Sequence, residues 1–444
     1  MRKVVLLIMF VFSYQFFFGT FLFIFPVEKD SDLTFDLTVL EHRQAYAQVI
    51  DDNEDALNLR LSLIQQSQES IKIAVHQFKD DASANLITMA LIERLKDGIE
   101  VEIIVDGLMN PNTSQDNYLL LKHYGASIKV FESNVLLLPY KGQNRLHDKF
   151  FLVDGMYGLI SGRNIGDRYF IKEENAVIDR DLFFIDPDTV EDMTSYFNQL
   201  ADPTYSRSIE GKLRDDELED IYQEHYDAYI EGHNLSTFFT NLMEGLLPVD
   251  GLIFLHNPIN RWKKEPVLMN TLLDLVKKEG RASIQTPYII FDKELAIQFD
   301  EVKDADIRIL TNTIQTSPNI FASSGYIFDR KNLAEDFQLF EIQSNLSRHT
   351  KTWLIGEDYL AIGSLNIDPR SNRLSTESMV VVKSNDLATI VQDQMHQEFD
   401  QSLQVDASGS YLEVDGINTV ETTFFKNTLI RIVGLFTYFF DALL

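Results

Sequence analysis

The fold is decided by the stretch His147-Asp-Lys149-Phe-Phe-Leu-Val-Asp154 and by its counterpart in the second half of the chain, His349-Thr-Lys351-Thr-Trp-Leu-Ile-Gly356. Each stretch is followed by a turn of small residues that ends in asparagine, Ser161-Gly-Arg-Asn164 and Gly363-Ser-Leu-Asn366. Side chains two positions apart on a strand point to the same face. Each half therefore offers an imidazole beside an ammonium group. The repetition predicts a duplicated fold with one symmetric site.

Two imidazoles surrounded by cations suit attack on a phosphodiester. One histidine can act as the nucleophile on phosphorus, and the other can protonate the leaving oxygen. The residues themselves do not decide which histidine takes which role.

These motifs resemble those of the phospholipase D superfamily, whose mark is H-x-K-x4-D followed by G-[SG]-x-N, twice per active site. The likeness to bacterial cardiolipin synthases extends roughly over residues 45 to 444. It includes the stretches 144–149, 162–170, 179–182, 285–288, 310–313 and 363–371, together with Glu377. The resemblance implies an α/β protein with two pseudo-twofold-related phospholipase D-like sandwich lobes that share one active site.

The resemblance also implies roles for individual residues. It makes His147 the nucleophile and His349 the acid/base. A nucleophilic imidazole needs an acceptor on its other nitrogen, and two downstream acids, Glu377 and Asp181, are candidates for the two halves. The remaining expected site residues are the charge-stabilising Lys149, Lys351, Asn164 and Asn366, the motif acid Asp154, and the pocket residues Ser364, Gly162 and His76. With four cationic or donor groups around one phosphate, no metal and no cofactor is expected.

One departure from the family pattern bears on activity. The second motif has Gly356 where aspartate is expected, with Glu357 and Asp358 just beyond it. Either a local bulge lets one of these acids substitute, or Glu377 suffices, or the enzyme is impaired.

The order of apolar and polar residues predicts strand–helix–strand alternation and a mostly parallel sheet in each half. Strands are expected at 71–78, 101–106, 127–131, 158–161, 251–255, 282–286, 306–311 and 337–342, and helices at 82–95, 118–124, 267–278 and 326–333. We expect the first lobe at 57–205 and the second at 206–444.

Both ends of the chain are apolar. Residues 4–25 carry no charge, follow Arg2-Lys3 and precede an acidic segment, which predicts a transmembrane anchor over 1–26 with its N-terminus in the cytoplasm, then a tether over 27–56. A cleaved signal peptide is the alternative. The C-terminal stretch 424–444 is either a helix packed on the core or an interfacial helix on a bilayer.

Composition narrows the class of substrate. The formal net charge of -29 disfavours nucleic acid, whose binding depends on lysine and arginine. The chain has no cysteine, which excludes thiol chemistry.

The resemblance to bacterial cardiolipin synthases implies a phosphatidyltransferase of the bacterial inner membrane with periplasmic lobes. Its expected donor is phosphatidylglycerol, and the acceptor is phosphatidylglycerol, phosphatidylethanolamine or water. An extracytoplasmic phosphodiesterase or nuclease and a non-catalytic lipid-binding protein are the alternatives.

Overall fold

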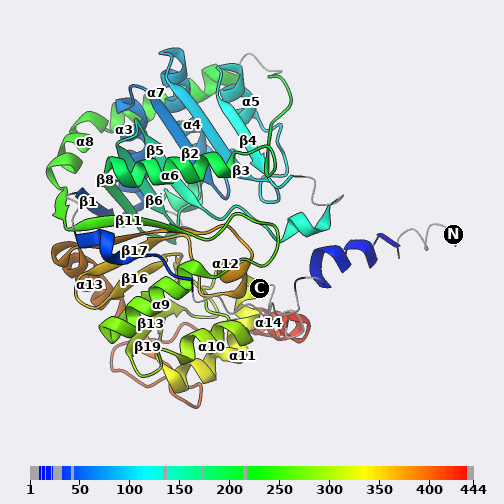
Figure 1. The fold of residues 1–444 in the computed structure, drawn as a ribbon, viewed down its shortest axis with the longest axis vertical. Coiled ribbons are helices and arrows are strands. Elements are labelled where there is room, and N and C mark those ends of the chain that lie inside the picture. The colour runs from blue at the N-terminus through cyan, green and yellow to red at the C-terminus, as the bar shows by residue number, and fades with distance from the viewer. Residues whose placement is uncertain are drawn as a thin grey trace.

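Two mixed β-sheets form the centre of the molecule, one for each half of the chain (Figure 1). They belong to a computed structural model that describes residues 10–11, 13–15, 17–21, 23, 33–41, 45–133, 138–172, 175–213 and 218–437.

The first sheet has the strand order β10-β1-β8-β6-β5-β2-β3-β4-β9. Its strands are β1 (Ala45–Ile50), β2 (Ser70–Val75), β3 (Glu100–Asp106), β4 (Ser127–Phe131), β5 (Lys149–Val153), β6 (Tyr157–Ser161), β8 (Asp181–Ile185), β9 (Ser206–Ser208) and β10 (Leu247–Val249). The order of the second sheet is β11-β18-β17-β16-β12-β13-β14-β19. Its strands are β11 (Gly251–His256), β12 (Arg281–Gln285), β13 (Asp306–Asn312), β14 (Gln338–Ile342), β16 (Thr352–Ile355), β17 (Tyr359–Gly363), β18 (Ser378–Lys383) and β19 (Ser402–Gln404). Without β10, the two orders correspond strand for strand, which confirms the predicted duplication.

The prediction of a mostly parallel sheet is wrong. Only β2, β3 and β4 run parallel in the first sheet, and only β12, β13 and β14 in the second. The other neighbouring strands are antiparallel. The chain turns back through a tight hairpin after each motif strand, and a hairpin can join only antiparallel strands.

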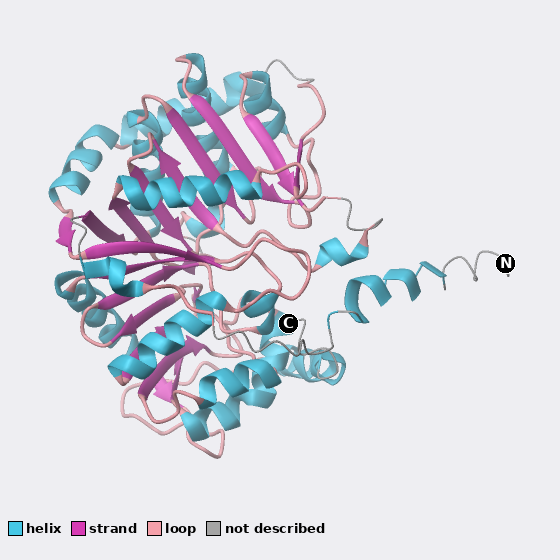
Figure 2. Ribbon diagram, viewed as in Figure 1, coloured by secondary structure: helices cyan, strands magenta, loops and turns pink. Residues whose placement is uncertain are grey.

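Helices cover the outer faces of both sheets (Figure 2). The first lobe carries α3 (Asn53–Gln66), α4 (Ala82–Lys96), α5 (Asp116–His123), α7 (Leu218–Gly232) and α8 (Leu235–Glu244). The second carries α9 (Val267–Glu279), α10 (Lys293–Asp300), α11 (Ile320–Asp336), α12 (Pro369–Arg373) and α14 (Phe424–Thr437). The short elements are η1 (Phe17–Phe21), η2 (Leu37–Glu41), η3 (Pro139–Gly142), η4 (Asp167–Tyr169), β7 (Val177–Ile178) and β15 (Ser347–Arg348).

Two further helices lie at the seam between the lobes. The helix α6 (Pro187–Leu200) contacts β5 and β6 of the first sheet and β11 of the second. The helix α13 (Asn385–Phe399) contacts β16 and β17 of the second sheet and β1 of the first. Apolar side chains of both lobes, such as Phe150 and Phe254, join one buried cluster there. The lobes are therefore fixed to each other by a continuous core.

The lobe boundaries differ from those expected. Residues 45–56 do not form a tether, because β1 pairs with β8 inside the first sheet and α3 begins at Asn53. The stretches 206–213 and 218–249 also belong to the first lobe, because β9 pairs with β4, β10 pairs with β1, and α7 packs on α4. The second sheet begins with β11. Its lobe also receives η2 from the N-terminal region, where Leu40 is buried beside β11 and β18.

The predicted membrane anchor over 1–26 falls largely on residues outside the described part of the chain, namely 1–9, 12, 16, 22 and 24–26. Within the residues that the structure describes, none of the helices is both long enough and apolar enough to cross a bilayer. The apolar stretch 424–437 forms α14, which packs against α11.

Candidate active site

Each motif histidine enters its sheet from a backbone segment that pairs with the other lobe. Leu146 forms a bridge with Thr376, and β15 pairs with β7. The backbone N–H of His147 lies 3.2 Å from the carbonyl oxygen of Thr376, and the N–H of His349 lies 2.7 Å from that of Ile178. The two crossings hold the start of both motif strands at the seam between the lobes.

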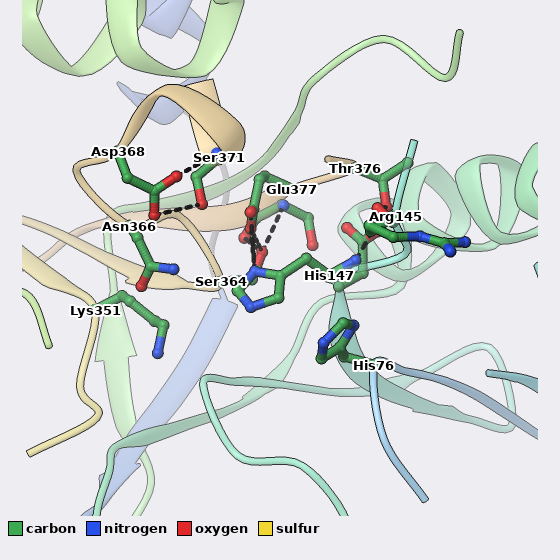
Figure 3. A network of polar contacts seen from close by, with 12 residues as sticks. His76, Arg145, His147, Lys351, Ser364, Asn366, Asp368, Ser371, Thr376 and Glu377 are labelled. Carbon is green, nitrogen blue, oxygen red and sulfur yellow. Dashed lines mark hydrogen bonds and ion pairs between the residues drawn. The ribbon is translucent and has the colours of Figure 1, made fainter. Parts of the chain in front are cut away.

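Each of the two imidazoles is held by a carboxylate that belongs to the opposite lobe. Nδ1 of His147 lies 2.8 Å from Oε1 of Glu377, and Nδ1 of His349 lies 2.7 Å from Oδ2 of Asp179. Both carboxyl groups are fully buried. Figure 3 shows Glu377 directed at the ring of His147 from the other lobe. Glu377 thus lies where the sequence predicts an acceptor, and neither lobe can hold its own histidine.

Asp181 does not contact His349, so the prediction of its role is wrong. It is the first residue of β8, and its carboxylate lies 2.5 Å from Nη1 of Arg60 and also accepts a hydrogen bond from Ser161. Its side chain therefore neutralises buried arginine inside the first lobe. The acceptor for His349 is Asp179, two residues earlier, which the sequence reasoning missed.

The pairing between the lobes places Asp179 and Glu377 at matching positions, which the sequence alone does not show. Thr376 bridges to the residue before His147, and Glu377 follows it directly. In the other lobe, Ile178 pairs with the residue before His349, and Asp179 follows it directly. The acceptor is the next residue after the crossing in both halves.

Gly162 and Ser364 lie behind the two carboxylates instead of facing a substrate, contrary to the prediction. A Cβ atom on Gly162 would lie 2.5 Å from Oδ1 of Asp179, so only glycine leaves room for that carboxylate. Ser364 occupies the matching position and donates its hydroxyl hydrogen to Oε2 of Glu377 at 2.5 Å. Both residues fix an acceptor in place.

The two motif lysines are almost completely buried beside their histidines. The ammonium group of Lys149 donates to the carbonyl oxygen of His147. Nζ of Lys351 donates to the carbonyl oxygen of His349 at 2.5 Å and lies 3.2 Å from its Nε2 atom. The predicted positions of both lysines are confirmed.

The motif asparagines are each held by a tyrosine that the sequence reasoning did not assign to the site. Nδ2 of Asn164 donates to the Tyr169 hydroxyl at 2.9 Å, and Nδ2 of Asn366 donates to the Tyr288 hydroxyl at 3.1 Å. The ring of Tyr169 also packs edge-on against His349, with 5.6 Å between ring centroids. Both tyrosines lie in stretches that resemble the family, and this resemblance could have assigned them to the site.

Burial and repulsion between neighbouring positive charges lower the pKa values of the basic groups of the site. Burial, followed by the charges of Lys149 and Lys351, holds the pKa of His147 well below its usual value. Burial, followed by the charge of Lys351, lowers the pKa of His349 to about 4, although its hydrogen bond to Asp179 opposes the shift. Burial lowers the pKa of Lys149 to about 7 and that of Lys351 to about 8. Such a cluster favours an anion between the two imidazoles.

The two acceptors differ in charge. Burial alone would raise the pKa of Asp179, but its hydrogen bond to His349 and the charge of Lys351 outweigh this and lower it. Burial raises the pKa of Glu377 to about 7 despite the nearby charge of Lys149. Asp179 therefore stays ionised near neutral pH, whereas Glu377 is close to its midpoint.

A cavity of about 230 Å³ opens beside His147 on the side of the second lobe. Its wall includes polar side chains from Tyr288, Asn366 and Arg370 and an apolar part from Phe321 at the start of α11. His76 packs on the His147 ring with 5.0 Å between ring centroids, and its Nδ1 atom lies 2.6 Å from the carbonyl oxygen of Leu146. His76 thus supports His147 and, contrary to the prediction, is not part of the cavity wall.

Asp154 lies at the far end of β5 from His147, so it takes no part in the site. Its carboxylate accepts the backbone N–H groups of residues 68, 69 and 70 at 2.9, 2.8 and 3.0 Å. These groups belong to the loop between α3 and β2 and to the first residue of β2. In the second lobe, α9 passes into β12 through Gly280, whose positive φ of 74° ends the helix without such a loop. Gly356, which directly follows β16, therefore stands where an aspartate would have no comparable turn to hold.

This geometry predicts that Gly356→Asp brings no gain in activity. The new Cβ atom would lie 2.9 Å from Oε2 of Glu279, so we expect a loss of stability of about 1 kcal/mol and an unchanged turnover number. The companion change Asp154→Ala leaves three N–H groups without their acceptor. It should cost about 1–3 kcal/mol in the free energy of unfolding, again with unchanged turnover. Denaturant unfolding and steady-state kinetics on both variants check this. A large gain in rate for Gly356→Asp would contradict it.

Comparisons with known proteins agree with the fold and the motifs. The family model described as "Cardiolipin synthase, PLD-like domain" matches residues 61–201 and 272–402. Cardiolipin synthase C of Escherichia coli (strain K12) is 27% identical over an alignment of 443 residues. The match covers 86% of this chain and 93% of that protein. A cardiolipin synthase of Oceanobacillus iheyensis is 20% identical over 365 residues, covering 80% of this chain and 69% of the other.

Among solved structures, the phosphatidylserine synthase of Haemophilus influenzae Rd KW20 has a similar fold. Its TM-score is 0.65 at 14% sequence identity, and the match covers 90% of this chain and 95% of that one. The family model spans both lobes and both histidine motifs, which is more than half of the chain. The chain therefore belongs to the phospholipase D superfamily, in the family of cardiolipin synthase PLD-like domains.

Proposed function

We propose that the protein is a phosphatidyltransferase that makes cardiolipin from phosphatidylglycerol and a second phospholipid, through a phosphohistidine intermediate. The observation that carries this proposal is the pair of motif histidines, each held by a buried carboxylate of the opposite lobe and each beside a buried lysine. The cardiolipin synthases among its relatives support the choice of a phospholipid substrate.

In the first step, Nε2 of His147 attacks phosphorus, and the bond from phosphorus to the oxygen of the glycerol headgroup breaks. His349 gives its proton to that oxygen, so glycerol leaves and a phosphatidyl group remains on His147. The cavity beside His147 supports this assignment, because it gives a phospholipid headgroup access to that ring. The hydrogen bond from Nδ1–H to Glu377 leaves the Nε2 lone pair free for attack.

In the second step, His349 removes a proton from the acceptor alcohol. The alcohol oxygen attacks phosphorus, and the bond to His147 breaks, which restores the starting enzyme. The ionised carboxylate of Asp179 supports this role, since it stabilises the imidazolium form of His349. Lys149, Lys351, Asn164 and Asn366 are the groups that would stabilise negative charge on the non-bridging oxygens.

His349 must hold a proton in the first step, although burial and nearby cations lower its pKa to about 4. The bound phosphodiester offsets those cations, because an anion within about 4–6 Å favours the charged form of an imidazole. Substrate binding and proton uptake by His349 are thus coupled in this proposal.

The same charges predict how activity depends on pH. With pKa values lowered to about 7 and about 8 by burial, Lys149 and Lys351 lose their protons as the pH rises through that range. The neutral amines no longer attract the phosphodiester, so we expect kcat/KM to fall as the pH rises from about 7 through about 8. The measurement is a pH profile of kcat/KM with phosphatidylglycerol. A profile that is flat up to pH 10 would contradict the prediction.

The central experiment uses purified protein with labelled phosphatidylglycerol, with and without phosphatidylethanolamine, and with the His147→Ala variant as control. Release of cardiolipin and glycerol that depends on His147 supports phosphatidyl transfer. Phosphatidic acid as the main product would indicate that water is the acceptor. The absence of any product that depends on His147 would overturn the proposal.

The proposal also includes the cellular location of the protein. The apolar stretch 4–25, preceded by Arg2-Lys3 and followed by acidic residues, supports an anchor in the bacterial inner membrane with the lobes on the periplasmic side. Fusing a reporter that is active only outside the cytoplasm to the C-terminus tests this orientation.

A further inference from the structure

Exposed phenylalanine and tryptophan side chains gather in a few segments of this protein. Among the described residues, all nine exposed phenylalanine and tryptophan side chains fall in four stretches of the chain. They are Phe10, Phe17, Phe18, Phe21, Trp262, Phe321, Phe328, Phe424 and Phe425. We call this set the aromatic rim. Exposed aromatic residues concentrated in this way mark an interaction site rather than ordinary surface.

One side of the aromatic rim borders the cavity beside His147. Phe321 lines that cavity and is still 56% exposed. The helix α14 packs on the same helix, α11, so closely that a Cβ atom on Gly434 would lie 2.6 Å from the ring of Phe328. At the start of α14, Phe424 and Phe425 are 88% and 78% exposed.

The other side of the aromatic rim reaches the same cavity through Arg370. This arginine lines the cavity and donates to Oε1 of Gln143 at 2.8 Å. Gln143 in turn donates to the carbonyl oxygen of Gly19 in η1, the segment that holds Phe17, Phe18 and Phe21. Figure 1 shows the blue N-terminal segment and the red α14 on the same side of the molecule.

Trp262 joins this second side. Its ring stacks on Tyr140 of η3 with 6.0 Å between centroids and on Phe23 with 5.7 Å, yet it is 55% exposed. The cavity therefore lies between two groups of exposed aromatic side chains.

The charge of these segments differs from that of the whole chain. Acidic residues outnumber basic ones by 68 to 39 overall. In contrast, none of the segments 10–23, 139–142, 261–264, 314–328 and 424–437 contains an aspartate or glutamate. The segment 424–437 carries Lys426 and the exposed Arg431. Segments without acidic residues meet less repulsion at a membrane of anionic lipids than the rest of this acidic protein would.

We propose that the aromatic rim is a docking surface for a lipid bilayer, which seats the cavity mouth at the level of the headgroups. A phospholipid then reaches His147 from the leaflet without crossing water. The rim phenylalanines at 10–21 belong to the stretch 4–25 that we propose as the anchor, so on that side the rim enters the bilayer with the anchor. The rings of Trp262, Phe321 and the start of α14 then lie in the interfacial layer. This inference rests on the proposed phospholipid substrate.

The absence of cysteine allows the docking surface to be located by single labels on the full chain. An environment-sensitive fluorophore is attached to Phe425→Cys on α14 or, as a matched control, to Ile221→Cys on α7, a position that is 51% exposed. Each protein is reconstituted into vesicles of phosphatidylglycerol and phosphatidylethanolamine with brominated acyl chains. We expect quenching at 425 to exceed that at 221 at least threefold. Equal quenching at both positions overturns the proposal.

A second pair of variants connects docking to turnover. Phe424→Ser/Phe425→Ser should lower the turnover of long-chain phosphatidylglycerol in vesicles about tenfold relative to Ile221→Ser/Ile390→Ser. Turnover of a short-chain, monomeric phosphatidylglycerol should stay the same in both. An equal loss on the monomeric substrate, or no loss in vesicles, overturns the proposal.

These outcomes separate this inference from the proposed function. If the wild-type protein turns over neither substrate, the proposed function fails, while the quenching comparison still decides where the bilayer binds. If the label at 425 is shielded before lipid is added and the protein sediments as a dimer, the aromatic rim is a contact between copies of the chain. That result overturns bilayer docking.

Discussion

His147→Ala is expected to lower phosphatidyl transfer by a factor of about 10⁵ or more, because it removes the atom that forms the bond to phosphorus. His349→Ala is expected to cost about 10²–10⁴, the usual contribution of a general acid or base. Each histidine has a buried lysine and a buried carboxylate beside it, so each is equipped for either role. Their roles must therefore be separated by chemistry rather than by position.

A phosphodiester with a nitrophenol leaving group makes that separation. Nitrophenolate leaves without a proton, so its release does not need the general acid. We expect His349→Ala to release a burst of nitrophenolate and to accumulate the remaining phosphoryl ester on His147, while His147→Ala shows no burst. Stopped-flow absorbance and mass spectrometry of the acid-labile phosphohistidine measure both. A burst from His147→Ala and none from His349→Ala would mean that the roles are reversed.

The second large effect is expected at the carboxylate that holds His349. Asp179→Asn keeps the shape of the side chain but can present its N–H₂ group to Nδ1, which favours the wrong imidazole tautomer. We expect kcat to fall by about 10³–10⁴, with the melting temperature nearly unchanged.

Asp181→Asn is the matched comparison, two residues along the same chain. It leaves the buried guanidinium of Arg60 without its charged partner, which should cost about 3–5 kcal/mol of folding free energy. The protein that does fold should keep most of its turnover number per active site. Thermal unfolding and active-site titration distinguish the two effects. If Asp181→Asn lost turnover at full stability and Asp179→Asn did not, the assignment of the acceptor would be wrong.

Much of the fold could be predicted because its signals are local. The apolar runs and helix patterns gave the right element types at positions such as 101–106 and 267–278, which the structure has as β3 and α9. The duplication followed from two matched motifs. The lobe boundary did not follow, because β1 and β10 are short strands whose place in the first sheet depends on pairing across about 200 residues of chain. The direction of the strands also depends on such pairing.

The residues of the site likewise divide into those that the sequence predicts and those that depend on how the strands pair. The positions of His147, Lys149, His349 and Lys351 follow from the period of a strand, and Glu377 from its place in the family pattern. The choice between Asp179 and Asp181 required the point where β7 ends and β8 begins. Asp154 was misassigned because a motif does not reveal which of its members face the substrate and which hold a turn.

The exchange of carboxylates also bears on how small such an enzyme can be. A single lobe would carry an imidazole with no acceptor for its Nδ1 proton, and a carboxylate with no ring to hold. The minimal working unit is therefore a pair of lobes, whether one chain joins them or two separate chains assemble. Any half-length ancestor of this protein would have had to work as a dimer.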